Sequence, residues 1–264
     1  MDEKKSSLGL LGALAGDIIG SVYEFDAPKT TDFEMFAPGS KVTDDSILTV
    51  AVADAILSGR SYLDCIRAYA LAYPDGGYGG MFREWIYADD PQPYNSFGNG
   101  SAMRVSPVAW AFTNADDVLR EAEASAAISH NHPEGIKGAQ AVALAIFRAR
   151  TGFRKDDIRR EMLQRFGYDL TRSLDEIRPG YHFDETCQKT VPPAIVAFLE
   201  SNDYEDAIRK AISLGGDADT LAAITGSMAS AFYGSVPHEI AVKAQLLIPP
   251  ELWDVVERFG QRFG

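Results

Sequence analysis

The sequence contains very little cysteine: Cys65 and Cys187 are the only two among 264 residues. Two cysteines so far apart cannot build a disulfide framework or a thiolate zinc site. Histidine is also scarce, with four residues and neither an HExxH motif nor an HD pair. Zinc peptidases and phosphohydrolases of the HD class are therefore disfavoured. Because so few thiols fit a reducing compartment, we expect a cytoplasmic location.

Basic residues are outnumbered, with 25 Lys and Arg against 38 Asp and Glu, which gives a net charge of −13 and a pI near 4.7. Such a surface repels phosphate backbones, and since the sequence has no basic patch, a nucleic-acid partner is disfavoured. Long apolar runs are missing too, because no segment approaches the roughly 18 apolar residues of a membrane span. The run 8–15 is short, rich in glycine and followed by Asp17, which argues against a signal peptide. We expect a soluble monomer, neither secreted nor anchored in a membrane.

A convincing series of alternating strands is absent as well, and apolar residues recur mostly at helical spacing. The 46% of apolar side chains is enough for one substantial core. These patterns predict one all-α domain over residues 1–264, with loops at 73–80, 87–100 and 168–190. The predicted helices cover residues 9–22, 47–57, 61–72, 116–128, 136–148, 156–166, 193–200, 204–213, 220–232 and 239–247.

The first predicted helix carries glycine on one face, at Gly9, Gly12, Gly16 and Gly20. Glycine destabilises a helix, so a glycine face indicates that another helix approaches closely. We therefore predict a tightly packed central helix.

Two further signals mark helix starts. Pro192 and Pro193 suit the first turn of the helix 193–200, and Ser61 with Asp64 is typical of a capping box.

Acidic residues gather at two predicted helix starts, in TDDS (43–46) and in GGDADT (215–220). Each segment has a structural interpretation, because threonine is a good N-cap and carboxylates are favoured in a first helical turn. If the two segments meet, however, they bring four carboxylates and two hydroxyls together, and such a cluster requires cations. Its oxygen ligands are those that Mg²⁺, Mn²⁺ or Ca²⁺ prefer. Periodicity does not show whether the segments meet.

Six motifs in a fixed order cover nearly the whole chain: GALAGDIIGSVYE (12–24), TDDS (43–46), GYGG (77–80), SFGNGSAMR (96–104), SH (129–130) and GGDADT (215–220). In this order they resemble the ADP-ribosylglycohydrolase family, which includes ADP-ribosylarginine and ADP-ribosylserine hydrolases and the enzyme that reactivates dinitrogen reductase. The resemblance implies a compact single-domain orthogonal helical bundle with a binuclear metal site. The implied ligands of two Mg²⁺ ions, with Mn²⁺ as the alternative, are Thr43, Asp44, Asp45, Asp217, Asp219 and Thr220.

The resemblance also implies catalytic roles for Glu24, Asp44, Asp45 and Asp219. Glu24 matches a glutamate beside the scissile bond, where a carboxylate accepts or donates a proton. Its structural interpretation is a solvated residue at a helix end. The segment 25–41 after it is expected to act as a movable flap.

Glycine-rich and polar loops resemble the ligand-binding part of the family. The implied substrate-binding residues are Gly77, Tyr78, Gly79, Gly80, Ser96, Phe97, Gly98, Asn99 and His130. The glycines would let backbone amides approach a diphosphate, and Phe97 would stack on adenine. A plain turn, a core aromatic and a structural histidine are the competing interpretations of these three features.

Four nearby side chains have less definite roles. Arg104 is expected to be structural, Arg83 and Trp85 either line the acceptor side or support the bundle, and His132 has no assigned role.

The implied function is hydrolysis of the bond between ADP-ribose and an acceptor, on a modified protein or small molecule. Arginine, serine, another group or the acetyl of O-acetyl-ADP-ribose stay open as acceptors, and acceptor choice is expected to depend on the loops 25–41, 84–95 and 168–190. The alternatives are a non-catalytic ADP-ribose-binding or structural protein, and a hydrolase of another N-glycoside or of ADP-ribosylated nucleic acid.

Overall fold

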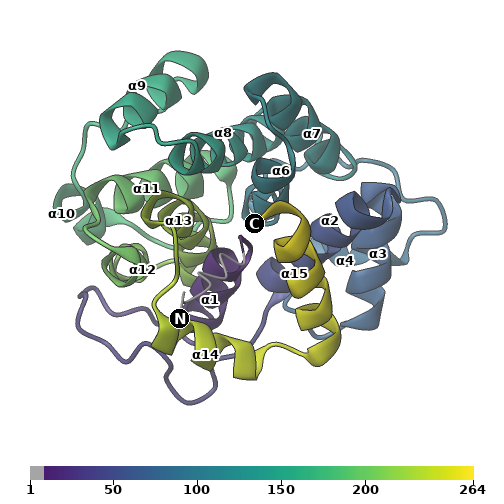
Figure 1. Cartoon of the computed structure of the whole chain (residues 1–264), viewed down its shortest axis with the longest axis horizontal. Coiled ribbons are helices and arrows are strands. Elements are labelled where there is room, and N and C mark those ends of the chain that lie inside the picture. The colour runs from purple at the N-terminus through teal and green to yellow at the C-terminus, as the bar shows by residue number, and fades with distance from the viewer. Residues whose placement is uncertain (1–8) are drawn as a thin grey trace.

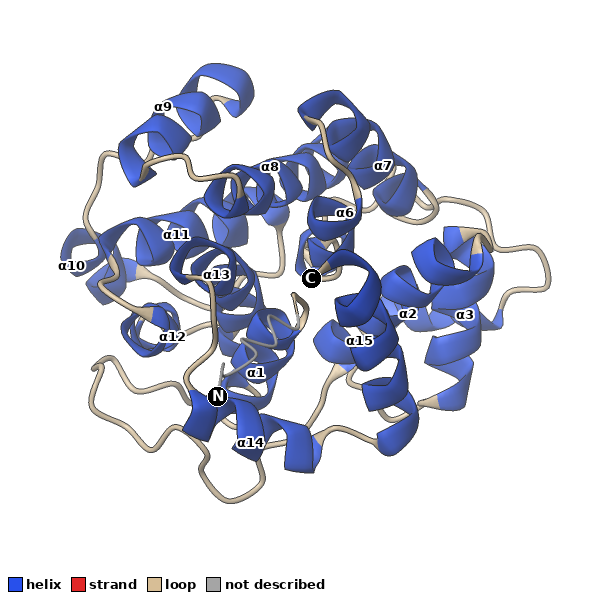
Figure 2. Ribbon diagram, in the orientation of Figure 1, coloured by secondary structure: helices blue, strands red, loops and turns tan. Residues whose placement is uncertain are grey.

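Fifteen α-helices and one turn of 3-10 helix form the structure, a computed structural model that describes residues 9–264 (Figures 1 and 2). The described part of the chain contains no strand, only an isolated antiparallel bridge between Gly98 and Thr186. The predicted all-α, single-domain class is confirmed. The helices are α1 (Leu11–Gly20), α2 (Asp44–Ser58), α3 (Tyr62–Ala72), α4 (Gly80–Tyr87), α5 (Gly100–Met103), α6 (Ser106–Ala111), α7 (Ala115–Ala127), α8 (Pro133–Arg150), α9 (Lys155–Phe166), α10 (Leu174–Ile177), η1 (Arg178–Gly180), α11 (Cys187–Glu200), α12 (Tyr204–Ser213), α13 (Ala218–Tyr233), α14 (His238–Leu247) and α15 (Pro250–Phe263).

Helices α1 and α13 lie near the middle of the molecule, side by side (Figure 1). All ten residues of α1 are buried. A Cβ atom added at Gly12 would lie 2.1 Å from Ser230 Oγ, and one added at Gly16 would lie 2.2 Å from the Ala222 carbonyl oxygen. Only glycine permits this approach, so the prediction of a tightly packed central helix is confirmed. The same contact places the start of α13 beside the end of α1.

The prediction for Pro192 and Pro193 was wrong, because both lie inside α11 rather than in its first turn. Proline cannot donate the usual helical hydrogen bond, so Pro193 leaves the Lys189 carbonyl free. The Tyr181 hydroxyl donates to that carbonyl at 3.1 Å and replaces the missing donor. The helix therefore continues past both prolines, and it starts at Cys187.

Other boundaries depend on apolar anchors that the sequence patterns did not single out. The segment 84–95, predicted as a loop, begins inside α4, whose side chains Phe82, Trp85 and Ile86 are buried. Helix α15 was not predicted, although its buried residues recur at helical spacing. Ser61 caps α3 by accepting from the Asp64 amide at 3.1 Å, but within residues 9–264 no bond from the Ser61 amide to the Asp64 side chain completes the predicted capping box.

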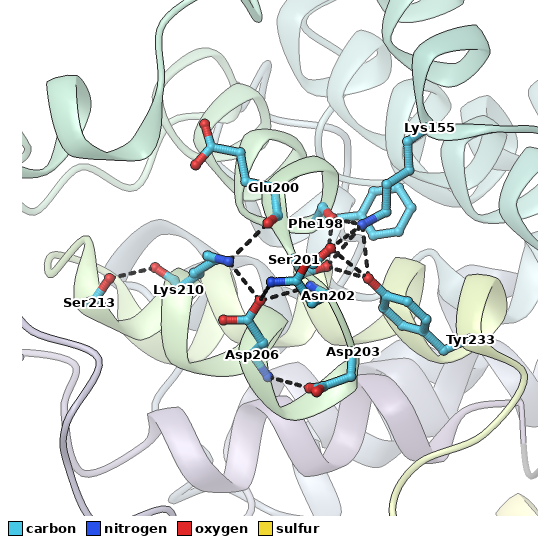
Figure 3. Close-up of polar contacts among 10 residues, drawn as sticks. All are labelled: Lys155, Phe198, Glu200, Ser201, Asn202, Asp203, Asp206, Lys210, Ser213 and Tyr233. Atoms are coloured by element: carbon cyan, nitrogen blue, oxygen red, sulfur yellow. Dashed lines mark hydrogen bonds and ion pairs between the residues drawn. The ribbon is translucent and has the colours of Figure 1, made fainter.

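Two lysines close the carboxyl end of α11 (Figure 3). Lys155 Nζ donates to the carbonyls of Phe198 and Ser201 at 2.8 and 2.6 Å, and Lys210 Nζ donates to the carbonyl of Glu200 at 2.9 Å. Cations are favoured at a helix carboxyl end, where carbonyls lack helical partners. These bonds join α9, α11 and α12, and α12 in turn leads into the segment 215–220.

No helix in the described range combines the length and the apolar character needed to cross a bilayer. Leu8, the first residue of the run 8–15 considered above as a signal peptide, lies outside the described residues, as do residues 1–7.

Candidate functional site

A cavity of about 340 Å³ opens beside the start of α2 and the start of α13. Loops and short helices from distant parts of the sequence form its other walls. Its acidic lining residues are Glu24, Asp44, Asp45, Glu185, Asp217 and Asp219, and its one basic lining residue among those described is Arg104. A cavity with this charge suits cations or a ligand that arrives with them.

Asp17 fixes the start of α2. Its carboxylate accepts from the Thr43 amide at 3.1 Å, the Thr43 hydroxyl at 2.5 Å and the Ser46 amide at 3.1 Å, and the Ser46 hydroxyl also donates to it. Thr43 is the N-cap of α2, as its structural interpretation required, and its hydroxyl accepts from the Asp45 amide at 3.4 Å. The hydrogen bonds of Asp17 therefore set the direction in which Asp44 and Asp45 leave the backbone.

The two acidic segments meet at the floor of the cavity. Carboxylate oxygens of Asp17, Asp45 and Asp219 lie within 4.8 Å of one another, and so do those of Glu24, Asp217 and Asp219. The Thr220 hydroxyl, from the second acidic segment, donates to the Asp45 carboxylate of the first at 3.2 Å. Asp219 belongs to both triads and joins them.

The carboxylates raise one another's pKa. The pKa values of Asp44, Asp45 and Asp219 lie well above the usual range for aspartate. Burial is the main cause, and repulsion from neighbouring carboxylates adds to it. Burial and the nearby Asp217 raise the pKa of Glu24 to about 7. Asp45 Oδ1 is buried and has no hydrogen-bond partner in the described chain. Hard divalent cations fit this donor set, because they replace the missing partners and offset the repulsion.

We expect Mg²⁺ to stabilise the protein more at about pH 7.5 than at about pH 5.5. A carboxyl group whose pKa is raised on folding binds more protons folded than unfolded, so the metal-free protein loses stability as pH rises from about 4 toward the Glu24 pKa of about 7. Cations remove that repulsion, and at the lower pH they compete with bound protons. Thermal unfolding with EDTA or saturating Mg²⁺ at both pH values measures this. An equal Mg²⁺-induced rise in Tm at both would contradict it.

The glycine loop 77–80 lies beside Asp44. The Asp44 amide donates to the Gly76 carbonyl at 2.7 Å, and a Cβ atom at Gly77, whose φ is +104°, would lie 3.3 Å from Asp44 Oδ1. Gly77, Gly79 and Gly80 line the cavity. Tyr78 does not line it, because its side chain packs into the apolar core. A substrate contact of the Tyr78 side chain is therefore not supported.

The segment 96–99 forms the opposite wall through backbone pairing with 185–187. The Asn99 amide donates to the Glu185 carbonyl at 2.7 Å, and the Cys187 amide donates to the Phe97 carbonyl at 2.9 Å. Phe97 is 44% exposed on the cavity wall, where an adenine ring could stack on it. Ser96, Gly98 and Asn99 line the cavity as well.

Asn99 also contacts the acidic floor. Its side-chain nitrogen donates to Asp217 Oδ2 at 2.6 Å and to the Thr190 hydroxyl at 3.0 Å. From the sequence, Asn99 was expected to contact the adenosine part of the ligand. In the structure its side-chain amide instead orients Asp217, a predicted metal ligand.

His130 is buried against the cavity, and burial holds its pKa well below the usual range, so the ring is neutral near pH 7. Arg104 donates to the Ser125 carbonyl at 3.1 Å, the structural role expected of it, and it also borders the cavity.

Trp85 is buried in the core and Arg83 is exposed, and neither lines the cavity. His132 caps α8 by accepting from the Glu134 amide at 3.1 Å.

The sequence analysis assigned no role to Asp17, Glu185 or Thr186, which the structure brings to the site. The sequence does contain a signal for Asp17, because it is the only charged residue in the apolar, glycine-rich helix α1. A buried carboxylate must be paired or hydrogen-bonded, so this position predicts a specific contact. Glu185 and Thr186 lie in a long mixed loop and carry no such signal.

Comparison with known proteins gives three findings. The family model described as ADP-ribosylglycohydrolase matches residues 4–263. The mouse protein "ADP-ribosylhydrolase ARH3" is 28% identical over 85% of this chain and 82% of its own length, and "ADP-ribosylarginine hydrolase Tri1" of Pseudomonas putida is 28% identical over 89% and 71%. A solved structure described as "ADP-ribosylglycohydrolase-related protein complex" superposes with a TM-score of 0.74 at 24% identity and covers 98% of both chains.

Proposed function

Because the chain belongs to the ADP-ribosylglycohydrolase family, we propose that it uses two Mg²⁺ ions to hydrolyse the glycosidic bond between ADP-ribose and an acceptor side chain. The relatives support ADP-ribosyl hydrolase activity. The use of two Mg²⁺ ions rests on one observation, the pair of acidic triads that share Asp219 at the cavity.

The proposed ligands of the ions are Asp45, Asp217, Asp219 and Thr220, together with Asp44, which also lines the cavity, and Thr43, the N-cap of α2. When bound, Mg²⁺ supplies positive charge that stabilises negative oxygens and orients them. Asp17 keeps its hydrogen bonds to Thr43 and Ser46 and holds the start of α2 in place. The Asn99 side-chain amide holds the Asp217 carboxylate in place through its hydrogen bond.

Hydrolysis adds the hydroxyl of water to the anomeric carbon and a proton to the leaving acceptor atom, through a transition state of oxocarbenium character. Glu24 is the group that we propose to move that proton. It is partly buried in the cavity wall, and a carboxyl group there can accept or donate a proton. The glycine loop 77–80 and Phe97 would bind the diphosphate and the adenine.

We propose arginine as the acceptor. Phe25, directly after Glu24, is 82% exposed and stacks on Phe183, which is 41% exposed, with ring centroids 5.5 Å apart. Asp26 directly follows Phe25 and Glu185 lies two residues after Phe183, and no ion pair joins either to a cation within residues 9–264. Aromatic faces and unpaired carboxylates together favour a planar cation such as a guanidinium group. A serine acceptor offers neither charge nor a plane.

We expect Phe25→Ala to lower kcat/KM for an ADP-ribosylarginine peptide by roughly 3- to 30-fold, the usual range of a cation–π contact, and to change the value for the matched ADP-ribosylserine peptide much less. Steady-state rates on both peptides measure this. Phe153→Ala is the control, because Phe153 is also an exposed phenylalanine but follows α8 and contacts Arg148, whereas Phe25 directly follows Glu24. Equal losses on both peptides would argue against an acceptor contact.

The proposed function is tested by ADP-ribose release from the two peptides with Mg²⁺ or with EDTA. Release that needs Mg²⁺ supports it. If neither peptide is hydrolysed while ADP-ribose still binds in a calorimeter, hydrolysis of these acceptors is refuted, and a binding protein becomes the better description.

A further inference from the structure

A chain of three buried residues runs from Arg104 through Ser129 to His130, behind the wall of the cavity. Arg104 Nη2 lies 3.0 Å from the Ser129 hydroxyl, and that hydroxyl lies 2.8 Å from His130 Nδ1. All three side chains are at most 4% exposed. Water therefore does not compete for these hydrogen bonds, and their directions follow from donor and acceptor counts alone.

An arginine side chain only donates, so the Ser129 hydroxyl oxygen accepts from Arg104. The hydroxyl has one proton of its own, and His130 Nδ1 is the acceptor it reaches among the described residues. If Nδ1 carried a proton instead, the serine proton would be left buried without a partner, which costs about 1–3 kcal/mol. The serine therefore donates to Nδ1, and the proton of the neutral ring lies on Nε2.

The protonated nitrogen is at the cavity. His130 lines it, and Nε2 has no hydrogen-bond partner within residues 9–264. A Cβ atom at Gly100 would lie 3.1 Å from Nε2, and one at Gly98 would lie 3.5 Å from it. These two glycines leave room for a ligand atom in front of the nitrogen.

We propose that Arg104 and Ser129 act as positioning residues that hold His130 in the Nε2–H tautomer, as a neutral donor to an anionic oxygen of the bound ligand. This rests on the proposed function for the identity of the ligand, a diphosphate. The opposite tautomer would direct a nitrogen lone pair at the same oxygen and repel it. A neutral His130 ring also suits a cavity lined by carboxylates. It can donate to an anion, and it carries no charge with which those carboxylates could form an ion pair.

Two-bond ¹H–¹⁵N correlation spectra of the full chain test the proposal, with His130→Gln identifying the His130 signals. The expected wild-type result is the Nε2–H tautomer. Ser129→Ala is expected to change the tautomer population and to weaken ADP-ribose binding about fivefold, the usual effect of one hydrogen bond. Ser125→Ala is the matched control, since that buried hydroxyl donates to the Ala122 carbonyl at 3.0 Å and does not touch His130.

An Nδ1–H tautomer in the wild type would overturn the proposal, and this result does not depend on whether Ser129→Ala folds. So would a Ser129→Ala protein with the wild-type tautomer and affinity. Ser129→Thr keeps the hydroxyl and should restore both. If wild type does not bind ADP-ribose, the proposed function fails, whereas the tautomer is still read from the ligand-free spectrum.

Discussion

Asp219→Asn is expected to lower ADP-ribose release by about a thousandfold, which corresponds to roughly 4 kcal/mol of transition-state stabilisation. The reason is that Asp219 belongs to both carboxylate triads, so one substitution removes a negative ligand from each. The amide keeps the size of the side chain and can still accept the hydrogen bond from the Thr220 amide, which spans 3.0 Å in the wild type. Single-turnover rates against Mg²⁺ concentration measure the loss.

The control for this variant is Asp116→Asn, since Asp116 is also in the first helical turn, of α7, but is exposed and does not line the cavity. We expect it to retain wild-type rates. The Mg²⁺-induced rise in Tm should disappear in Asp219→Asn alone. Near-native turnover of Asp219→Asn at limiting Mg²⁺ would remove Asp219 from the ligand set.

Gly16→Ala is expected to destabilise the protein by about 4 kcal/mol or more, because the new methyl group meets backbone rather than a flexible side chain. Its carbon would lie 2.2 Å from the Ala222 carbonyl oxygen and 2.9 Å from the Ala223 amide nitrogen. Relief requires α1 and α13 to separate. The expected fall in Tm is about 10 °C.

Thermal denaturation with EDTA measures this change, and Gly180→Ala is the control, because a Cβ atom there has no neighbour within 4 Å. Separation of the two helices also moves Asp17 away from Asp219. We therefore expect Gly16→Ala to weaken the Mg²⁺ response as well. A stable variant with an unchanged response would show that α1 and α13 tolerate a wider spacing.

Periodicity predicted the helical class and most helices, because apolar spacing reports which face of a segment is buried. It failed where a tertiary contact decides the boundary. Pro192 and Pro193 are locally typical of a helix start, but both lie inside α11, where the Tyr181 hydroxyl, from another segment, donates to the Lys189 carbonyl that Pro193 leaves free. Helix α4 was missed because its segment also contains the glycine and tyrosine residues typical of a loop.

The site was predictable from motif order rather than from physical pattern. Spacing placed TDDS and GGDADT at helix starts, but it does not indicate that two segments lie close in space when, like Asp45 and Thr220, they are 175 residues apart in the sequence. The close approach of α1 and α13 brings them together. Asp17 was missed because the glycine face of its helix was read as packing alone. The orientation of Asn99 toward Asp217 depends on a loop pairing that no local pattern encodes.

The charge of the cavity is expected to make binding of the two proposed ligands cooperative. Its described lining holds six acidic residues and one arginine, so a cation and an anionic diphosphate each reduce the cost of binding the other. Coupling between two ligands is reciprocal in free energy. The affinity for ADP-ribose is therefore expected to rise with Mg²⁺ concentration by the same factor by which ADP-ribose raises the affinity for Mg²⁺, and product held in the site would slow the loss of its cations.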